Sequence, residues 1–206
     1  MSKVTEPLQD SQAQGVDPGD AQYLRRIVSA RVYDVARKTP LEHATHLSAR
    51  LDNRVLIKRE DLQPVHSFKL RGAYNKIIQL TEAQRRRGII CASAGNHAQG
   101  VALAGKRLGI RAVIVMPRTT PQIKVRAVAA LGGEVLLHGD GFDEAATHAL
   151  ALVDEQGLEY IPPYDDPQVI AGQGTVGMEI LQQHPGPIHA LFCCVGGGGL
   201  IAGIAA

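Results

Sequence analysis

The feature that most constrains the fold is a regular alternation of short, mostly apolar runs with segments of helical length. Runs of strand length occupy residues 89–92, 113–116, 134–137 and 159–161. Segments of helical length and spacing lie between them, at 96–108, 121–131 and 142–156. Apolar strands separated by helices are typical of a parallel sheet that is covered on both faces. We therefore predict an α/β fold.

The segment before this alternation predicts a short strand followed by a helix. Residues 55–57 are apolar and form the expected strand. A helix is expected to run from Ser67 to about Leu80, because apolar residues recur on one face of that segment. Thr81 and Gln84 have the spacing of a capping box, so a further turn of helix is expected to begin there.

The two ends of the chain differ from its middle. Residues 1–20 are polar, lack arginine and match neither a secretory signal nor a transit peptide, so we predict a disordered tail. Towards the other end we expect a helix at 175–183 and a strand at 191–195. Residues 200–206 begin an apolar segment, whereas a natural C-terminus is usually polar. We therefore expect the chain to be the first part of a longer protein.

Composition excludes several classes of function. The 206 residues carry a formal charge of +2, and 45% of them are hydrophobic. So balanced a charge does not indicate nucleic acid or an anionic membrane as a partner, and no apolar stretch is long enough to span a bilayer. Cys91, Cys193 and Cys194 give neither a disulfide framework nor a zinc site, which fits a cytoplasmic protein.

Lys69 is the first residue that the pattern singles out for chemistry. If Ser67 caps the helix, Lys69 falls in its first turn, where the helix dipole disfavours a positive charge. An ordinary lysine gains nothing from that place, whereas a lysine that forms an imine needs its neutral amine. The alternative is a surface lysine whose charged end reaches solvent, and the residue alone leaves both readings open.

Two glycine-containing loops could bind anions. Ser93, Ala94, Gly95, Asn96 and His97 lie at a predicted strand-to-helix junction, where backbone N–H groups can hold a carboxylate or a phosphate. The alternative is that Ser93 or Asn96 simply caps the helix.

The second loop is a run of four glycines. Gly196, Gly197, Gly198 and Gly199 precede Leu200, between the predicted strand at 191–195 and the apolar segment. Glycines can turn their N–H groups towards a dianion without steric hindrance from a Cβ atom. The alternative is a flexible linker, but linkers usually have polar neighbours, so we favour an anion site.

Two other patterns are interpreted as having no function. Residues 172–177 match the G-x-G-x-x-G spacing of dinucleotide-binding loops, but no clear strand precedes them and no acidic residue follows at the expected distance. His43 and His46 have a spacing that metal ligands use, but no carboxylate or cysteine completes a set. We predict neither a dinucleotide site nor a metal site.

The order of these motifs resembles the threonine/serine dehydratases, and the biosynthetic threonine deaminases most of all. The resemblance rests on Ser-Phe-Lys-Leu-Arg-Gly-Ala at 67–73, Ser-Ala-Gly-Asn-His-Ala-Gln-Gly at 93–100, Gly-Gln-Gly-Thr at 172–175 and Gly-Gly-Gly-Gly-Leu at 196–200. These enzymes use pyridoxal phosphate and have the tryptophan-synthase-β-like fold. The resemblance covers the chain from about residue 27 to its end.

The resemblance implies a role for each loop. Lys69 would be the catalytic lysine that forms the Schiff base with pyridoxal phosphate. Asn96 would hydrogen-bond the 3-hydroxyl oxygen of the cofactor, and 196–199 with Leu200 would hold its phosphate. The loop 93–97 would bind the substrate carboxylate.

The resemblance also implies a reaction, namely the removal of water and ammonia from L-threonine to give 2-oxobutanoate, a step of isoleucine biosynthesis. Lys69 would take the Cα proton as general base. The substrate would be an amino acid, threonine or serine, and the full-length protein would be a homo-oligomer. Other hypotheses are a catabolic dehydratase or racemase of the same fold, an NAD-binding oxidoreductase that uses 172–177, and a non-catalytic fragment.

The resemblance implies two lobes with parallel sheets flanked by helices. The large lobe would begin with residues 21–63 and return with 166–206, where it would be truncated. The small lobe would comprise 64–165, and the cofactor would lie between the lobes.

Overall fold

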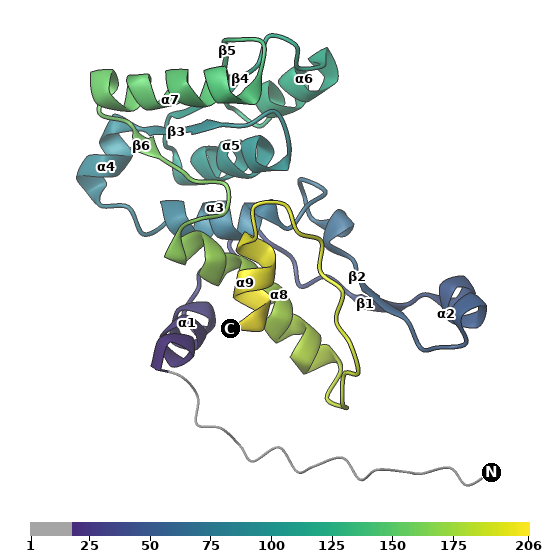
Figure 1. Ribbon diagram of the computed structural model, residues 1–206. Helices are drawn as coiled ribbons and strands as arrows, with labels where there is room; N and C mark the ends of the chain where they lie inside the picture. Colours follow the sequence, from purple (N-terminus) through teal and green to yellow (C-terminus); the bar gives the residue numbers. More distant parts are fainter. Residues whose placement is uncertain (1–17) are drawn as a thin grey trace, which may run out of the picture.

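A computed structural model describes residues 18–206 (Figure 1). Its main sheet has four parallel strands in the order β5-β4-β3-β6. The bounds of these strands are β3 (Ile89–Ala92), β4 (Ala112–Met116), β5 (Glu134–Leu137) and β6 (Glu159–Tyr160). All residues of β3 and β4 are buried, as expected for central strands of a parallel sheet.

Helices cover both faces of this sheet (Figure 1). On one face, the apolar side chains of helix α5 (Asn96–Leu108) pack on alternate strand residues such as Cys91 and Ile114. On the other face, helix α7 (Phe142–Gln156) packs on the intervening residues, such as Ile90 and Val113. The remaining helices around the sheet are α4 (Glu82–Arg87) and α6 (Gln122–Ala130). The two-sided α/β layering predicted from the sequence is confirmed.

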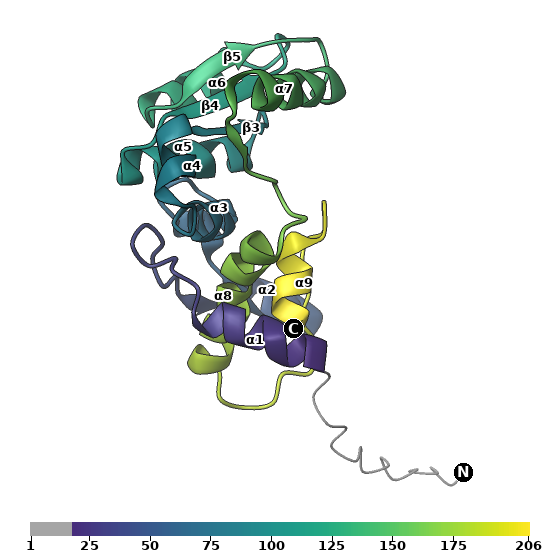
Figure 2. The same cartoon turned by 90° about the vertical axis from the view of Figure 1, so that its left-hand side faces the viewer.

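The rest of the described chain is mainly helical. A small antiparallel pair of strands places Leu41 opposite Lys58. Figure 2 shows the four-stranded sheet at one end of the molecule and α1, α8 and α9 at the other, with α3 between them. The elements of this part are α1 (Pro18–Val28), β1 (Leu41–His43), α2 (Thr45–Leu51), β2 (Leu56–Lys58), the 3₁₀ turn η1 (Glu60–Leu62), α3 (Lys69–Ile77), α8 (Pro167–Gln183) and α9 (Gly199–Ala205).

Helix α3 is the element that joins the two ends of the molecule, since it packs on both α5 and α8. A Cβ atom added to Gly100 of α5 would lie 3.1 Å from the Cα of Leu70. A Cβ atom added to Gly172 of α8 would lie 2.7 Å from the Cα of Gly72. Glycines on both neighbours therefore let their backbones approach α3 closely.

Several expectations about the elements hold and others are wrong. The capping box of Thr81 and Gln84 is present at the start of α4. The predicted strand at 191–195 is wrong, because this segment has no regular structure and no strand of the described residues pairs with it. Helix α8 begins at Pro167 rather than 175, because the Asp166 side chain accepts hydrogen bonds from the amides of Gln168 and Val169.

Smaller differences concern element ends. Helix α3 is shorter than predicted at both ends, and α6 begins at Gln122 with Pro121 as its N-cap. Helix α1 begins at Pro18, so the last residues of the predicted tail are helical, and 1–17 lie outside the described residues. Within 18–206, no helix has the length and apolar character needed to cross a membrane.

Candidate active site

Lys69 lies at the start of α3, in its first turn as predicted. Its amide donates a hydrogen bond to the Oγ of Ser67 at 3.1 Å. Its Nζ donates one to the carbonyl oxygen of Pro163 at 2.6 Å, and it lies 5.6 Å from the centre of the Phe68 ring. No carboxylate in the described part of the chain forms an ion pair with this amine. Lys69 is thus a half-buried amine held by a neutral acceptor.

Burial lowers the pKa of Lys69 below its ordinary value, and the negative charge of a deprotonated Cys194 opposes this shift only in part. A lysine with a lowered pKa has a larger share of neutral amine at pH 7, and the neutral amine is the nucleophilic form. The reading of Lys69 as an ordinary surface lysine is therefore not supported by its surroundings.

The loop 93–97 follows the buried strand β3 and leads into α5. The Ser93 amide donates to the carbonyl oxygen of Val115 at 3.0 Å, and its Oγ accepts a hydrogen bond from the Gly95 amide at 3.2 Å. The N-cap of α5 is Gly95, which has no side chain to cap the helix. The alternative in which Ser93 or Asn96 caps α5 is therefore wrong.

Helix α5, which follows this loop, lies against the start of α3. A Cβ atom added to Gly100, one turn into α5, would lie 3.2 Å from the carbonyl carbon of Lys69. The side chain of Asn96 is exposed, and the residues Ala94 and Gly95 are half-buried. A Cβ atom added to Gly95 would meet nothing within 4 Å, so there is open space beside this backbone.

His97 is buried within the same helix turn. Its Nε2 lies 2.8 Å from the carbonyl oxygen of Ile161. Burial, together with a smaller effect of the Lys69 charge, lowers the pKa of His97 to about 4, although the contact with Ile161 opposes this shift. The imidazole is therefore neutral at pH 7, and it ties α5 to the chain that follows β6.

The four-glycine loop leads into α9. Gly198 has a φ of +90°, a conformation that favours glycine, and Leu200 is half-buried on α9. A Cβ atom added to Gly197 would lie 2.1 Å from Cδ1 of Tyr164, so the tyrosine ring lies against this loop. Among the described residues, the amides of Gly196, Gly197 and Gly198 donate no backbone hydrogen bond. These amides are therefore available to an anion.

The segment 161–164 brings the predicted pieces together. Its carbonyl oxygens contact His97 and Lys69, and its tyrosine covers the glycine loop. The sequence interpretation missed this role of Pro163 and Tyr164, because it treated the prolines after β6 only as the end of a strand. It also missed Cys194, which is close enough to Lys69 to affect its pKa although the two are far apart in the sequence.

The two rejected patterns lie elsewhere in the fold. Residues 172–177 lie inside α8 and are fully buried there, so they form a helix-packing surface rather than a phosphate-binding loop. His43 and His46 are exposed, and no group of three metal-ligating side chains occurs in the described part of the chain. Neither pattern contributes to the candidate site.

A parallel α/β sheet with a half-buried lysine and glycine loops beside its helices is an arrangement that suits the binding of a small molecule. A family model described as "Pyridoxal-phosphate dependent enzyme" matches residues 32–206, and the chain belongs to this family. The fold expected for such enzymes is therefore confirmed, and pyridoxal phosphate is the cofactor of the family.

Individual relatives make the likeness more specific. The chain is 60% identical over 185 residues to the chloroplastic biosynthetic threonine dehydratase of Arabidopsis thaliana, and 56% identical over 198 residues to the biosynthetic L-threonine dehydratase of Escherichia coli. These matches cover 90% and 96% of this chain but only 31% and 38% of those proteins. The chain thus spans about a third of the length of the curated relatives that it matches.

Solved structures agree with this assignment. The processed form of threonine deaminase isoform 2 from Solanum lycopersicum is 60% identical, with a TM-score of 0.89 over 92% of this chain and 55% of that one. Maize serine racemase is 34% identical, with a TM-score of 0.80 over 89% of this chain and 55% of that one.

The residues of the candidate site fit the family's cofactor. Pyridoxal phosphate carries an aldehyde, which needs a neutral amine, and a phosphate, which needs hydrogen-bond donors. Lys69 offers an amine whose pKa is lowered by burial, and Gly196–Gly198 offer amides without backbone acceptors. Added Cβ atoms on Gly196 and Gly198 would meet nothing within 4 Å, so a ligand can approach this backbone.

Proposed function

We propose that this protein is a threonine dehydratase, which converts L-threonine to 2-oxobutanoate and ammonia in isoleucine biosynthesis. The observation that carries the proposal is the half-buried amine of Lys69, which has a neutral hydrogen-bond acceptor and a lowered pKa. The identity of 55–60% to proteins named threonine dehydratase gives the substrate class. The activity is proposed for the whole protein, since the chain spans a third of the relatives' length.

The proposed roles follow the sequence prediction. Lys69 attaches the cofactor through Nζ, and Gly196–Gly199 with Leu200 hold its phosphate through backbone amides. Asn96 donates a hydrogen bond to the cofactor's 3-hydroxyl oxygen. Ser93, Ala94, Gly95, Asn96 and His97 bind the carboxylate of the substrate.

The proposed chemistry needs one proton acceptor from the chain. Bound pyridoxal phosphate supplies a conjugated ring that withdraws electrons from the substrate Cα. Once the substrate's amino group has replaced it on the cofactor, the amine of Lys69 takes the Cα proton. The ammonium group so formed can give this proton to the hydroxyl group, which leaves Cβ as water. Hydrolysis of the released enamine then gives 2-oxobutanoate and ammonia. His97 is neutral at pH 7, so it adds no positive charge beside the amine.

We also propose the arrangement in lobes implied by the resemblance. Residues 64–165 form the small lobe, while 21–63 and 166–206 belong to the large lobe. This division is supported by the sheet, whose strands all lie between 89 and 160, and by the packing of α8 on α1 and α9. Cysteines without disulfides in the described residues fit a reducing compartment, for which we propose the cytoplasm. A homo-oligomer is proposed for the full-length protein.

A racemase is the second candidate, favoured by the likeness to maize serine racemase. A dehydratase and a racemase both need an amine that takes the Cα proton, but a racemase must also return a proton to the opposite face. Product analysis separates the two, since a racemase gives the D-amino acid rather than a 2-oxo acid.

Reductive trapping tests the proposal on the chain itself. The protein is incubated with pyridoxal phosphate, treated with borohydride and digested, and the modified lysine is found by mass spectrometry. We expect the adduct on Lys69, its loss in Lys69→Ala, and no loss in Lys124→Ala, a matched change of an exposed lysine on α6. Equal trapping on other lysines in Lys69→Ala would contradict the proposal.

Turnover needs the rest of the catalytic domain. We would therefore join residues 32–206 to the remaining part of the Escherichia coli dehydratase and measure 2-oxobutanoate formed from threonine. Lys69→Ala should abolish its formation and Lys124→Ala should not. A chimera that binds the cofactor but releases D-allothreonine from L-threonine, or D-serine from L-serine, would favour the racemase.

A further inference from the structure

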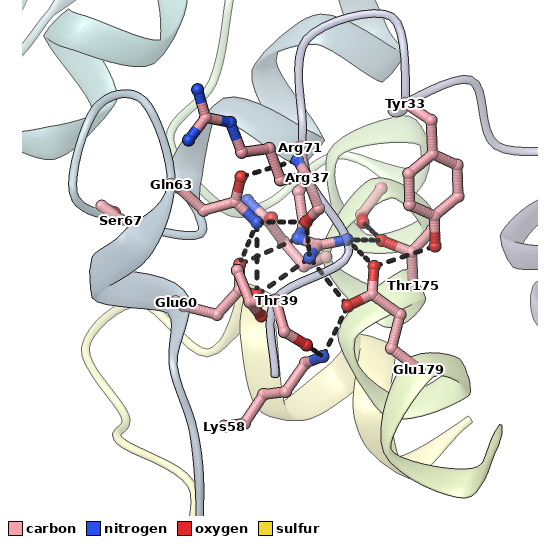
Figure 3. Close-up of polar contacts among 12 residues, drawn as sticks. Tyr33, Arg37, Thr39, Lys58, Glu60, Gln63, Ser67, Arg71, Thr175 and Glu179 are labelled. Atoms are coloured by element: carbon pink, nitrogen blue, oxygen red, sulfur yellow. Dashed lines mark hydrogen bonds and ion pairs between the residues drawn. The ribbon is translucent and has the colours of Figure 1, made fainter. Parts of the chain in front are cut away.

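A buried cluster of charged side chains lies directly behind the start of α3 (Figure 3). We call it the Arg71 cluster. The side chains of Arg71 and Glu179 are completely buried, and Lys58 is 8% exposed. Its members are Lys58, Glu60, Arg71, Thr175 and Glu179.

Arg71 donates through all three nitrogens of its guanidinium group. Nε and Nη2 donate to the two carboxylate oxygens of Glu60, both at 2.8 Å. Nη1 donates to Oε1 of Glu179 at 2.7 Å and to Oγ1 of Thr175 at 3.0 Å. Nη2 also reaches the carbonyl oxygen of Arg37 at 3.2 Å. The planar guanidinium is therefore fixed from several directions at once.

The charges within the cluster balance. Nζ of Lys58 lies 2.6 Å from Oε2 of Glu179, so two positive side chains face two carboxylates. Burial opposes the charge on Arg71, but the hydrogen bonds that it donates to Glu60 and Glu179 outweigh this effect and raise the pKa of Arg71. Burial likewise opposes the charge on Glu179, but Arg71 and Lys58 outweigh it and lower the pKa of Glu179. The two groups stay ionised around neutral pH.

Arg71 and Lys69 point to opposite sides of α3. Successive residues of an α-helix are about 100° apart, so positions two residues apart are about 200° apart. The Lys69 amine reaches Pro163, whereas the Arg71 guanidinium reaches Glu60 before α3 and Glu179 on α8. The cluster therefore fixes the rotation of the same helix turn that carries Lys69.

The glycine contacts around α3 leave its rotation to be fixed by side chains. Backbone contacts at Gly100 and Gly172 hold α3 on two sides, but glycine surfaces are smooth and give little resistance to turning. A buried ion cluster has strict geometry, and replacement of such clusters by apolar residues often leaves stability unchanged or higher. Such a cluster can select one arrangement of the elements that it joins.

We propose that Arg71, held by Glu60 and Glu179, is a positioning residue that sets the rotation of α3 and so keeps the Lys69 amine half-buried against Pro163. The proposal rests on the proposed function only in treating Lys69 as the reactive amine. Its prediction is that a change in the cluster alters the protonation of Lys69, which no cluster residue contacts.

The test measures Lys69 directly, without cofactor. Competitive labelling with acetic anhydride over a pH series, followed by peptide mass spectrometry, gives the titration midpoint of each lysine. Arg71→Lys keeps the positive charge but loses the planar fork. We expect its Lys69 midpoint to rise by about one pH unit, which is about a tenfold loss of neutral amine at pH 7, because the amine gains water.

A second variant separates positioning from simple electrostatics. Glu179→Gln removes a negative charge, and this alone would lower the midpoint of Lys69. If α3 turns and the Lys69 amine gains water, the midpoint of Lys69 rises instead. We expect this rise to outweigh the lowering, so the midpoint should also rise in Glu179→Gln. The matched control is Arg111→Lys, which removes the same planar fork from an exposed pair with Glu134 at 2.8 and 3.0 Å and should leave Lys69 unchanged.

Unchanged or lowered midpoints in folded Arg71→Lys and Glu179→Gln would overturn the proposal. If neither variant folds, Thr175→Val is used, since it keeps both ion pairs and removes only the hydroxyl group that accepts from Arg71 and donates to the carbonyl oxygen of Gly172. A smaller rise is expected there, and no rise would also overturn the proposal. The failure of borohydride trapping at Lys69, with the midpoints shifted as expected, would reject the proposed function while leaving the positioning intact.

Discussion

The backbones of Gly72 and Gly172 meet without any side chain between them, since a Cβ atom on Gly172 would lie 2.7 Å from the Cα of Gly72 and 2.7 Å from the carbonyl oxygen of Arg71. This contact sets the distance between α3 and α8. Both partners are backbone atoms, which cannot move aside as a flexible side chain can.

Gly172→Ala should therefore destabilise the fold. The added methyl group must push α3 and α8 apart, and such overpacking costs about 1–3 kcal/mol. Urea denaturation followed by circular dichroism measures this loss. Gly177→Ala on the same helix is the control, because its Cβ atom would meet Ile204 at an ordinary 3.4 Å and should leave the midpoint nearly unchanged. Equal effects of the two substitutions would contradict the close approach.

The glycine loop should be sensitive to a side chain at Gly197. In Gly197→Val the side chain clashes with the Tyr164 ring, whereas in the control Gly141→Ala, outside the loop, the methyl group meets nothing within 4 Å. We expect Gly197→Val to weaken pyridoxal phosphate binding about tenfold or more while leaving the fold largely intact. Spectrophotometric titration gives the dissociation constants.

Asn96→Ala should have a milder effect on the same binding. It removes one hydrogen bond in the proposed arrangement, worth about 1 kcal/mol or about a fivefold change in affinity. Dissociation constants measured beside those of Gly197→Val provide the comparison. If Asn96→Ala is the more damaging of the two, the glycine loop is not the main anchor of the cofactor.

Acid should destabilise the protein through His97. Burial holds the folded pKa of His97 at about 4, below its ordinary 6.5, so the unfolded chain binds the proton first. The stability that the neutral His97 contributes is complete above pH 6.5 and is lost as the pH falls towards 4. The free energy of unfolding should fall by about 3 kcal/mol over this range because of His97. Unfolding free energies from pH 7 to 4 should show a shallower decline in His97→Gln. The control His46→Gln, at an exposed histidine, should show the same decline as the unchanged chain. If the decline in His97→Gln is as steep as in the unchanged chain, His97 is not the source of the acid sensitivity.

The cysteines should differ in their reaction with iodoacetamide. Cys91 is completely buried in β3, and burial raises the pKa of its thiol, whereas Cys194 is exposed. We expect Cys91 to react at least about tenfold more slowly than Cys194 under native conditions. Peptide mass spectrometry at timed intervals measures both rates, with urea-unfolded protein as the reference in which they should converge. Rapid native labelling of Cys91 would show that the sheet opens easily.

Local patterns in the sequence are sufficient to predict the strands of the main sheet and the helices that cover it. Helix α5 was predicted with its true bounds, because Gly95 and Gly109 mark its ends and apolar residues recur between them. The prediction of a strand at 191–195 is wrong. An apolar run becomes a strand only beside another strand that pairs with it, and the run itself does not show whether such a strand is present.

The candidate site could be predicted only in part. Lys69 was singled out by its place in the first turn of a helix. The two loops were singled out by glycines, which leave backbone amides accessible to an anion. Their contacts through Pro163 and Tyr164 depend on the path of the chain after β6, which no local pattern gives. The Arg71 cluster was missed for the same reason, since Arg71 and Glu179 are 108 positions apart. One signal was available, because Glu179 is the only charged residue in the sequence of α8.

The ring of Tyr164 against Gly197 has an optical consequence. The chain contains five tyrosines and no tryptophan, so tyrosine emission is not masked by a stronger fluorophore. A ligand that settles on the glycine loop changes the polarity around this ring and, if it absorbs in the near ultraviolet, accepts its excitation energy. The difference between the emission of the unchanged chain and that of Tyr164→Phe therefore follows occupancy of the loop in real time, without any attached dye.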